Sequence, residues 1–424
     1  MSLVILGAAI AVLLILRVPV AFAFLGPSLA YMLMTGQSAG TSLRQVTDAT
    51  QSFPLLAVPL FVFLGSLANH AGLADKLFRF AMAALARVRG NLGYVTVGGS
   101  VGFSWMSGSA VADAAALGKV QIPAMLRNGY SRRFATGLSA SSSLIAPVMP
   151  PSIPAVIYAG LAAASTGALF AASVVPALLM AAGLCVVVFI MVRRQPNLTA
   201  GQFDMAELLA SVRGVLLPAV TPVIILGGIL GGLFTPTEAA GVAVVYVLLI
   251  AVATRSLSWH GFLASVRETV ITTAGIMLIV AAAALLGHIL ARERLPQMLT
   301  ELLFGLTESP IVFLLLISLL MLVLGTVIDA TAILVLVVPI LLPIAGQYGI
   351  DPINLGLVLI MSLMIGLLTP PVGTALFVTA SVSETRVGEV FRGALPFAVP
   401  AVVVLLLVIL IPDVILFLPG VLDL

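Results

Sequence analysis

Long apolar stretches alternate with short polar connections along the whole chain, and this pattern predicts helices that cross a membrane. About 20 apolar residues cross a hydrocarbon core about 30 Å thick. Ten stretches approach that length, five in each half: 3–16, 18–34, 53–69, 131–163 and 167–192, then 214–233, 237–254, 269–290, 353–382 and 393–412. The first is short and has neither a basic start nor a cleavage motif, so we expect a span and not a signal peptide.

Two further apolar segments, 91–127 and 309–346, do not fit single crossings, because small polar residues interrupt each near its middle. Ser107-Gly108-Ser109 interrupts the first segment, and Gly325-Thr326 interrupts the second. Each arm has roughly 15 residues, and a helix of that length reaches only about 22 Å. We therefore predict two re-entrant helical hairpins, whose arms enter the membrane and turn back.

The two halves share the same spacing of aspartate and proline residues. Asp113 stands ten residues before Pro123, and Asp329 stands ten before Pro339. Further along lie Pro150-Pro151 and Pro370-Pro371, 220 residues apart in a chain of 424. A repeat of helices broken by Gly, Ser, Thr and Pro is typical of secondary transporters, whose binding sites lie where the breaks meet.

This repeat predicts the domain organisation. Residues 1–192 form the first repeat, 193–213 a cytoplasmic connector, and 214–424 the second repeat, with hairpins at about 91–127 and 309–346. Each half has five crossings, an odd number, so the halves are expected to have inverted topology. The expected fold is therefore an all-α polytopic membrane protein, with about ten transmembrane helices and two re-entrant hairpins.

Composition supports the membrane assignment and excludes several classes of function. Hydrophobic residues make up 61% of the chain and charged residues 8%, with a mean hydropathy of +1.25, whereas a soluble domain carries about 25% charge. Cys185 is alone, the three histidines are far apart, and no phosphate-binding GxxxxGK[ST] loop occurs. We therefore expect that the protein is not an enzyme, that it has no cofactor and that it does not bind nucleic acid.

The basic residues indicate an orientation. With every span alternating and both hairpins re-entrant, fifteen of the 19 Lys and Arg residues fall inside: Arg17, Lys76, Arg79, Arg87, Arg89, Arg127, Arg132, Arg133, Arg193, Arg194, Arg213, Arg255, Arg267, Arg386 and Arg392. Only Arg44, Arg292 and Arg294 fall outside. This asymmetry follows the positive-inside rule and predicts that both termini are periplasmic.

Three shorter stretches are amphipathic: 70–90, 255–268 and 291–308. They are typical of helices that lie along the membrane interface, although ordinary solvated loops remain the alternative. Thr235 and Glu238, at the start of the seventh span, predict a capping box.

The breaks offer oxygen ligands. Glycine permits the turn, hydroxyl groups add oxygens, and prolines release carbonyls by removing amide donors; such neutral oxygens suit a hard alkali cation. Asp113 and Asp329 are intramembrane carboxylates and therefore functional candidates, although each also fits helix capping. Lys119 could attract an anionic substrate, or it could be a structural or snorkelling lysine.

The same residues carry a resemblance. The stretches 107–118, 122–125, 150–154, 234–240 and 366–373, which read SGSAVADAAALG, IPAM, PPSIP, FTPTEAA and GLLTPPVG, resemble the large membrane subunit of TRAP (tripartite ATP-independent periplasmic) transporters over essentially the whole chain. The resemblance implies an elevator mechanism, sodium coupling, a small membrane subunit and a periplasmic substrate-binding protein. It also implies organic-acid substrates, including C4-dicarboxylates and sialic acid.

The resemblance also supplies site residues. One sodium site would use Ser107, Ser109, Ala146, Met149 and Pro151, and the other Gly325, Asp329, Gly366, Thr369 and Pro371. Ala146 departs from the family, which usually has Gly there, and a backbone with positive φ at that residue would be strained. Candidate substrate-binding residues are Ser107, Gly108, Asp113, Lys119 and Thr326.

These observations predict sodium-coupled uptake of a small organic acid across the bacterial inner membrane. The alternative is a sodium- or proton-coupled anion carrier of the same architecture that works without a binding protein. The sequence does not name the substrate.

Overall fold

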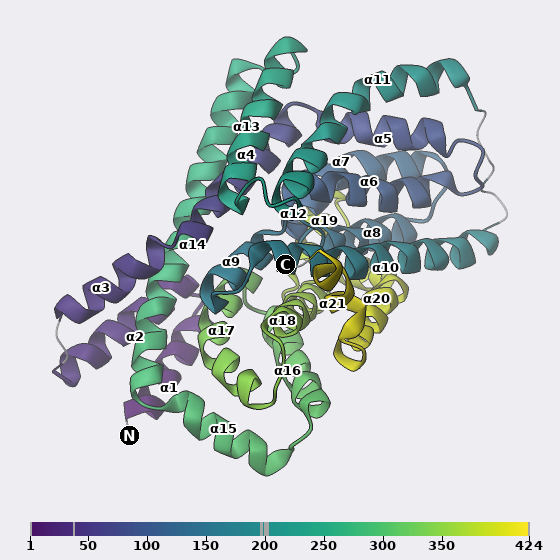
Figure 1. Ribbon diagram of the computed structural model, residues 1–424. Coiled ribbons are helices and arrows are strands. Elements are labelled where there is room, and N and C mark those ends of the chain that lie inside the picture. The colour runs from purple at the N-terminus through teal and green to yellow at the C-terminus, as the bar shows by residue number, and fades with distance from the viewer. Residues whose placement is uncertain (1, 37–38, 196–197, 199–202, 423–424) are drawn as a thin grey trace.

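The computed structural model describes residues 2–36, 39–195, 198 and 203–422, and every regular element in these ranges is helical (Figure 1). The helices of the first half are α1 (Ser2–Ile15), α2 (Val20–Met34), α3 (Ala39–Thr50), α4 (Ala57–His70), α5 (Leu73–Ala84), α6 (Asn91–Ser107), α7 (Ala110–Arg127), α8 (Arg132–Ser142), α9 (Ile153–Ala162) and α10 (Thr166–Arg193). Short 3-10 turns precede α4 and follow α8. The predicted all-α class is confirmed for the described residues.

The second half has a similar series. Its helices are α11 (Met205–Pro222), α12 (Gly228–Leu230), α13 (Pro236–Ala253), α14 (Trp259–Arg292), α15 (Leu295–Leu306), α16 (Pro310–Gly325), α17 (Ala330–Gln347), α18 (Pro352–Gly366), α19 (Thr374–Val382), α20 (Val387–Leu410) and α21 (Asp413–Val421). A π-helical turn, Val223–Gly227, joins α11 to α12. The capping box predicted at the start of α13 is present.

The first interrupted segment folds back on itself. The turn at Gly108 and Ser109 separates α6 from α7. Gln121 of α7 donates to the carbonyl of Thr96 at 3.5 Å, and the Thr96 hydroxyl lies 3.8 Å from the sulfur of Met125. Contacts between residues about equally far before and after the turn require two antiparallel arms, so this segment is a helical hairpin, and its re-entry into the membrane stays a prediction.

The second interrupted segment does the same. Tyr348, at the end of α17, donates from its hydroxyl to the carbonyl of Thr307 at 2.9 Å, just before α16 begins. Its ring also stacks on Phe313 in the first turn of α16, with centroids 4.6 Å apart. The return arm therefore ends where the outgoing arm starts. The side of the membrane from which each hairpin enters stays a prediction.

Two spans are broken. The fourth predicted span is split into α8 and α9, and the ninth into α18 and α19. The prolines at both breaks remove amide donors, so the helix cannot continue through them. In both breaks the Pro–Pro bond, Pro150–Pro151 or Pro370–Pro371, is cis.

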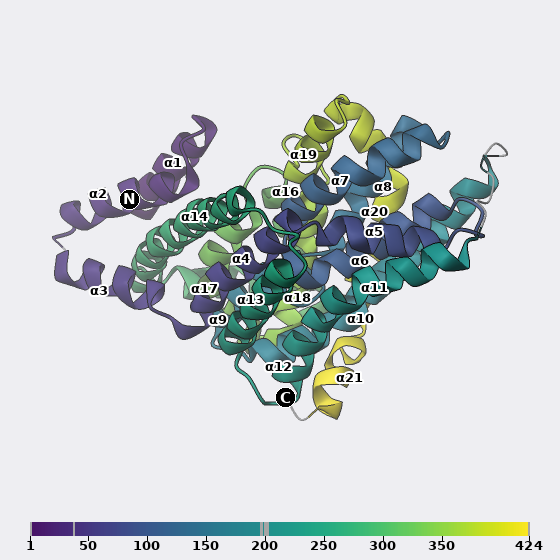
Figure 2. The same cartoon turned by 90° about the horizontal axis from the view of Figure 1, so that it is seen from above.

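Two groups of helices meet around these breaks (Figures 1 and 2). In one, α14 packs against α2, α3 and α4, and α13 packs against α4. In the other, each hairpin packs against a broken span: α7 contacts α8 and α19, α16 contacts α18, and α17 contacts α9. The two groups touch where α14 meets α17 and where α4 meets α6 and α9.

One prediction about the interface helices is wrong. Residues 255–268 were expected to form a separate helix along the interface, but α14 runs without a break from Trp259 to Arg292. No proline occurs in this stretch, so nothing interrupts the helix between its polar start and its apolar remainder. The other two amphipathic stretches do contain separate helices, α5 and α15, and α15 meets α16 at 118°.

The span count also needs refinement. Among the described residues, seven helices are long and apolar enough to cross a membrane, or up to eight if the bent α15–α16 pair counts as one span. One of the seven, α17, is an arm of the second predicted hairpin, so six of them match predicted spans. The other four predicted spans contain the shorter apolar helices α1, α2, α9 and α18, of which α9 and α18 are arms of the broken spans. Two helices, α3 and α21, were not foreseen at all.

Candidate functional site

The tip of the first hairpin is formed by three small residues. Ser107 ends α6, Gly108 adopts a left-handed φ of 58°, and Ser109 caps α7 by accepting a hydrogen bond from the Ala112 amide at 3.4 Å. Glycine is the residue that takes this conformation without strain. The tip therefore turns the chain within two residues and points the positive end of the α7 dipole out of the turn.

This tip lies directly against the first broken span. The Ile153 amide donates to the Gly108 carbonyl at 3.4 Å. A Cβ at Gly108 would lie 2.6 Å from the Pro151 carbonyl oxygen, so only glycine allows this approach. The break itself is held by Ser152, whose hydroxyl donates to the Pro147 carbonyl and caps α9.

Several oxygens at this junction have free hydrogen-bonding capacity. The Ser107 hydroxyl is buried, at 4% exposure, and has no hydrogen-bond partner among the described residues. Within that part of the chain, no hydrogen bond reaches the carbonyls of Ala146, Met149 or Pro151. Buried polar groups are normally paired, so these atoms fit a cation that supplies the missing interactions.

Ala146 is compatible with this junction. Its φ of −57° and ψ of −45° lie in the right-handed helical region. Alanine adopts this conformation readily, so alanine in place of the glycine that the resemblance implies introduces no backbone strain here.

The second tip is built by close backbone packing. A Cβ at Gly366 would lie 2.7 Å from the Leu322 carbonyl oxygen and 2.9 Å from the Gly325 Cα. The Thr326 carbonyl accepts from the amides of Val372 and Gly373, both at 3.0 Å. The end of α16 is therefore fastened to both sides of the α18–α19 break.

The predicted second sodium site is partly engaged in local hydrogen bonds. Asp329 caps α17 by accepting from the Thr331 amide at 2.9 Å. The Gly366 carbonyl accepts from the Thr369 amide at 2.9 Å, and the Thr369 hydroxyl donates to the Ile365 carbonyl at 3.1 Å. Carboxylate, hydroxyl and carbonyl oxygens keep further lone pairs, so each remains able to bind a cation, as does the Pro371 carbonyl.

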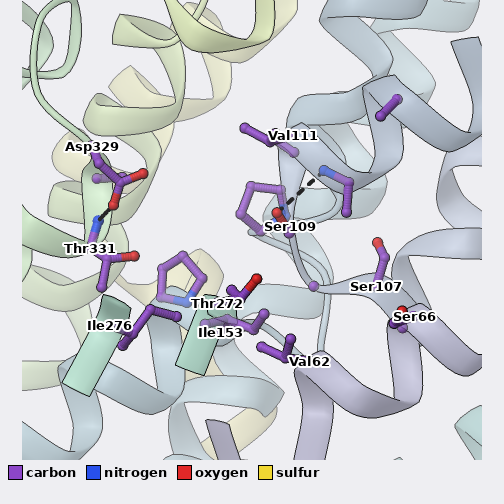
Figure 3. A pocket seen from close by; sticks show the side chains of 18 of the residues that line it. Val62, Ser66, Ser107, Ser109, Val111, Ile153, Thr272, Ile276, Asp329 and Thr331 are labelled. Carbon is purple, nitrogen blue, oxygen red and sulfur yellow. Dashed lines mark hydrogen bonds between the residues drawn. The ribbon is translucent and has the colours of Figure 1, made fainter. Parts of the chain in front are cut away.

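A cavity of about 530 Å³ lies between the two tips and the helices α4 and α14. Figure 3 shows Ser107 and Ser109 on one side of it and Asp329 and Thr331 on the other. Its polar lining consists of Ser66, Asn69, Ser107, Ser109, Glu268, Thr272, Asp329 and Thr331. The cavity thus joins the hairpins of one helix group to the wall of the other.

The candidate cation ligands are the hydroxyl, carboxylate and carbonyl oxygens described above. The described residues contain no cluster of three or more His, Cys, Asp or Glu side chains that could hold a metal ion.

Comparison with known proteins identifies the family. The model of the DctM component of the tripartite ATP-independent periplasmic transporters matches residues 8–414. The chain belongs to this family. It is thus a multi-pass membrane permease and not an enzyme.

Individual relatives agree with the family match. The TRAP permease is 42% identical to the sialic acid TRAP transporter large permease protein SiaM of Vibrio cholerae, over 96% of both chains. It is 36% identical to the C4-dicarboxylate TRAP transporter large permease protein DctM of Pseudomonas aeruginosa, over 93% of both. The crystal structure of the YdaH transporter of Alcanivorax borkumensis is similar at a TM-score of 0.62 over 86% of both chains, with 15% identity, which shows the fold alone.

The substrate candidates of the TRAP permease divide into two sets. Ser107 and Gly108 line the cavity, whereas Asp113, Lys119 and Thr326 do not. Asp113 is buried on another side of α7, beside Ser100 of α6, and Lys119 is exposed further along α7. Thr326 is buried, and its hydroxyl donates to the Val323 carbonyl at 2.8 Å.

Sequence reasoning missed the opposite wall of the cavity. Ser66 and Asn69 come from α4, and Glu268 and Thr272 come from α14. The Ser66 hydroxyl donates to the Glu268 carboxylate at 2.5 Å and joins the two helices. One signal was available: Glu268 is the only acidic residue between Glu238 and Glu293, and it directly precedes the predicted span 269–290.

Proposed function

We propose that this TRAP permease takes up a small organic acid across the bacterial inner membrane in symport with sodium. The family description, an ATP-independent tripartite transporter, and the names of the relatives, which mention sialic acid and C4-dicarboxylates, support an organic-acid substrate. An ion gradient would then drive the uptake, and the oxygen-rich junctions are the candidate binding sites for that ion.

The ion sites follow the two junctions. Ser107, Ser109 and the carbonyls of Ala146, Met149 and Pro151 would hold one sodium ion. A second ion would be held by oxygens of Gly325, Asp329, Gly366, Thr369 and Pro371. Each ion would fasten a hairpin tip to a broken span, so that ion binding orders one wall of the cavity.

The transport step is proposed to be an elevator movement. The two hairpins and the two broken spans would slide as one body against α2, α3, α4, α13 and α14. The cavity between these groups supports this division, because its lining comes from both. A substrate bound at the tips would change sides of the membrane when the moving body shifts past the wall.

The proposed assembly has three components. The small membrane subunit would widen the stationary wall, and a periplasmic substrate-binding protein would deliver the substrate. In this arrangement both termini of the permease face the periplasm. The description "tripartite" supports a transporter of several parts.

One observation carries the sodium proposal: among the described residues, the buried Ser107 hydroxyl has no partner, and the nearby carbonyls of Ala146, Met149 and Pro151 accept no hydrogen bonds. The test is uptake into proteoliposomes that contain the permease, its small subunit and its binding protein, with the proton gradient clamped. Replacing sodium by potassium is expected to abolish uptake. Equal uptake in both salts would contradict sodium coupling.

The partners are tested in the same system. Uptake is expected from the complete set and not from the permease alone. Uptake by the permease alone at the rate of the complete set would favour the stand-alone carrier.

A further inference from the structure

The cavity carries negative charge on two sides, on the wall formed by α4 and α14 and on the second hairpin. Two carboxylates line it, Glu268 and Asp329, and no Lys, Arg or His is among its described lining residues. Ser66 fixes the Glu268 carboxylate at the wall through their 2.5 Å hydrogen bond, and no basic side chain of the described chain pairs with it. An anionic substrate between the tips therefore meets this charge, and no basic side chain among the described lining residues of the cavity offsets it.

The end of the cavity formed by the first turn of α7 suits the binding of one anionic group. The first turn of α7, an 18-residue helix, lines the cavity with Val111 and Ala112, and helix N-termini attract carboxylates. The Ser107 hydroxyl is buried, lacks a partner among the described residues and lines the same cavity, so it can donate its hydrogen to a carboxylate while its oxygen binds the proposed sodium ion. The N-terminus of α17, by contrast, is already capped by the carboxylate of Asp329.

Three basic or titratable side chains lie in an adjoining space. A groove of about 430 Å³ along α14 is lined by His70, His260 and Arg267, and it shares Glu268 and Ile271 with the cavity. No hairpin residue lines this groove. A substrate that touches the hairpin tips therefore faces Glu268 and not these three cationic or titratable groups.

We propose that Glu268, held by Ser66, is a specificity-determining residue that selects substrates with a single carboxylate. The carboxylate of the substrate binds at the α7 tip, and its neutral hydroxyl or amide groups face the wall of Ser66, Asn69 and Thr272. A second carboxylate at the far end is disfavoured by repulsion from Glu268. This inference rests on the proposed transport of organic acids and narrows their class.

The test uses two probes that differ only at one end. D-Gluconate and D-glucarate share a six-carbon hydroxylated chain, and glucarate carries a second carboxylate. Binding is measured by titration calorimetry on the purified complex of the permease with its small subunit in saturating sodium, so that the binding protein does not contribute selectivity. Gluconate is expected to bind at least about tenfold more tightly than glucarate, because only glucarate brings a second carboxylate toward Glu268.

Glu268→Gln is expected to bring the ratio of the two dissociation constants close to one, mainly by tightening glucarate. Glu301→Gln, on an exposed residue of α15 that does not line the cavity, is the matched control and should leave the ratio unchanged. Thermal unfolding of each variant checks that the protein stays folded.

The outcomes separate this inference from the proposed function. Equal affinities in the native complex, no binding of gluconate, or an unchanged ratio in Glu268→Gln would each overturn the selection by Glu268. Sodium-driven uptake of an organic acid would still stand in those cases. Loss of sodium dependence in the transport assay would instead refute the proposed symport, whatever the ratio.

Discussion

The two hairpin tips share a plan and differ in charge. Each tip packs against a Pro–Pro break, and each is followed by a capped helix of 18 residues. The first cap is the neutral hydroxyl of Ser109, and the second is the carboxylate of Asp329. The first junction thus offers a cation only neutral oxygens, whereas the second also offers a negative charge.

Because of this difference, two junctions of similar architecture can differ in whether they favour an anionic substrate or only a cation. A sodium ion at the second junction would be neutralised by Asp329. A sodium ion at the first junction would leave a net positive charge beside the N-terminus of α7, which already favours anions. On this proposal the first junction would be the better place for the substrate carboxylate, and the second would serve mainly to bind an ion.

The sharpest test of the shared plan is the side from which each hairpin enters. Single cysteines replacing Val88 and Asn128, at the ends of the first hairpin, are expected to react only from the cytoplasm, and those replacing Glu308 and Gln347 only from the periplasm. All four residues are exposed, and Cys185 would be replaced beforehand. Membrane-impermeant maleimide labelling of intact cells and inverted vesicles measures the sides, and reaction of one hairpin's ends from opposite sides would contradict re-entry.

The second prediction concerns the close contacts of both tips. Gly108→Ala and Gly366→Ala are each expected to abolish uptake, because the new Cβ would lie 2.6 Å and 2.7 Å, respectively, from a backbone oxygen. The cost is about 1–3 kcal/mol of stability, and Gly108→Ala adds strain at positive φ. Uptake and thermal unfolding are measured together. Gly346→Ala is the control, since nothing lies within 4 Å of its new Cβ.

The third prediction separates the two caps. Asp329→Asn is expected to raise the sodium concentration for half-maximal uptake about tenfold or more, because a charged ligand is lost. Ser109→Ala should raise it less and should also cost about 1 kcal/mol in stability through the lost cap. Sodium titrations of uptake compare the two variants, and shifts of the same size would show that the two junctions do not differ as described.

The smallest effect is expected at Ala146. Its right-handed helical backbone suits alanine as well as glycine, so Ala146→Gly should change the half-maximal sodium concentration less than about twofold and lower stability by about 0.5–1 kcal/mol. A large gain in sodium affinity would mean that alanine restrains the first junction.

The junctions could be foreseen because their signals are local. Glycine, serine and paired prolines inside apolar stretches leave few conformations for the chain. These residues therefore predicted the positions of both hairpin turns and both helix breaks. The oxygens of Ser107 and Asp329 followed from the same stretches. Asp113 and Lys119 were candidates for substrate binding because of their charge inside the first hairpin, but they do not line the cavity, since a helix carries successive side chains to different faces.

The wall of the cavity could not be foreseen in the same way. Ser66 and Glu268 are 202 residues apart. Neither belongs to a motif or to the pattern of helix-breaking residues that the two halves share. The polar start of α14 even suggested a helix boundary, because charge inside a span is unusual. Only the packing of α4 against α14 turns these two residues into one feature.

The length of α14 has a consequence for the surrounding lipid. Its 34 residues span about 51 Å at 1.5 Å per residue, well beyond a hydrocarbon core of about 30 Å. Such a helix meets the bilayer by tilting or by extending out of it, and its tilt responds to bilayer thickness. The same helix carries Glu268, so we expect the uptake rate to depend on the acyl-chain length of the lipid. Uptake rates in vesicles of graded acyl-chain length would measure this dependence.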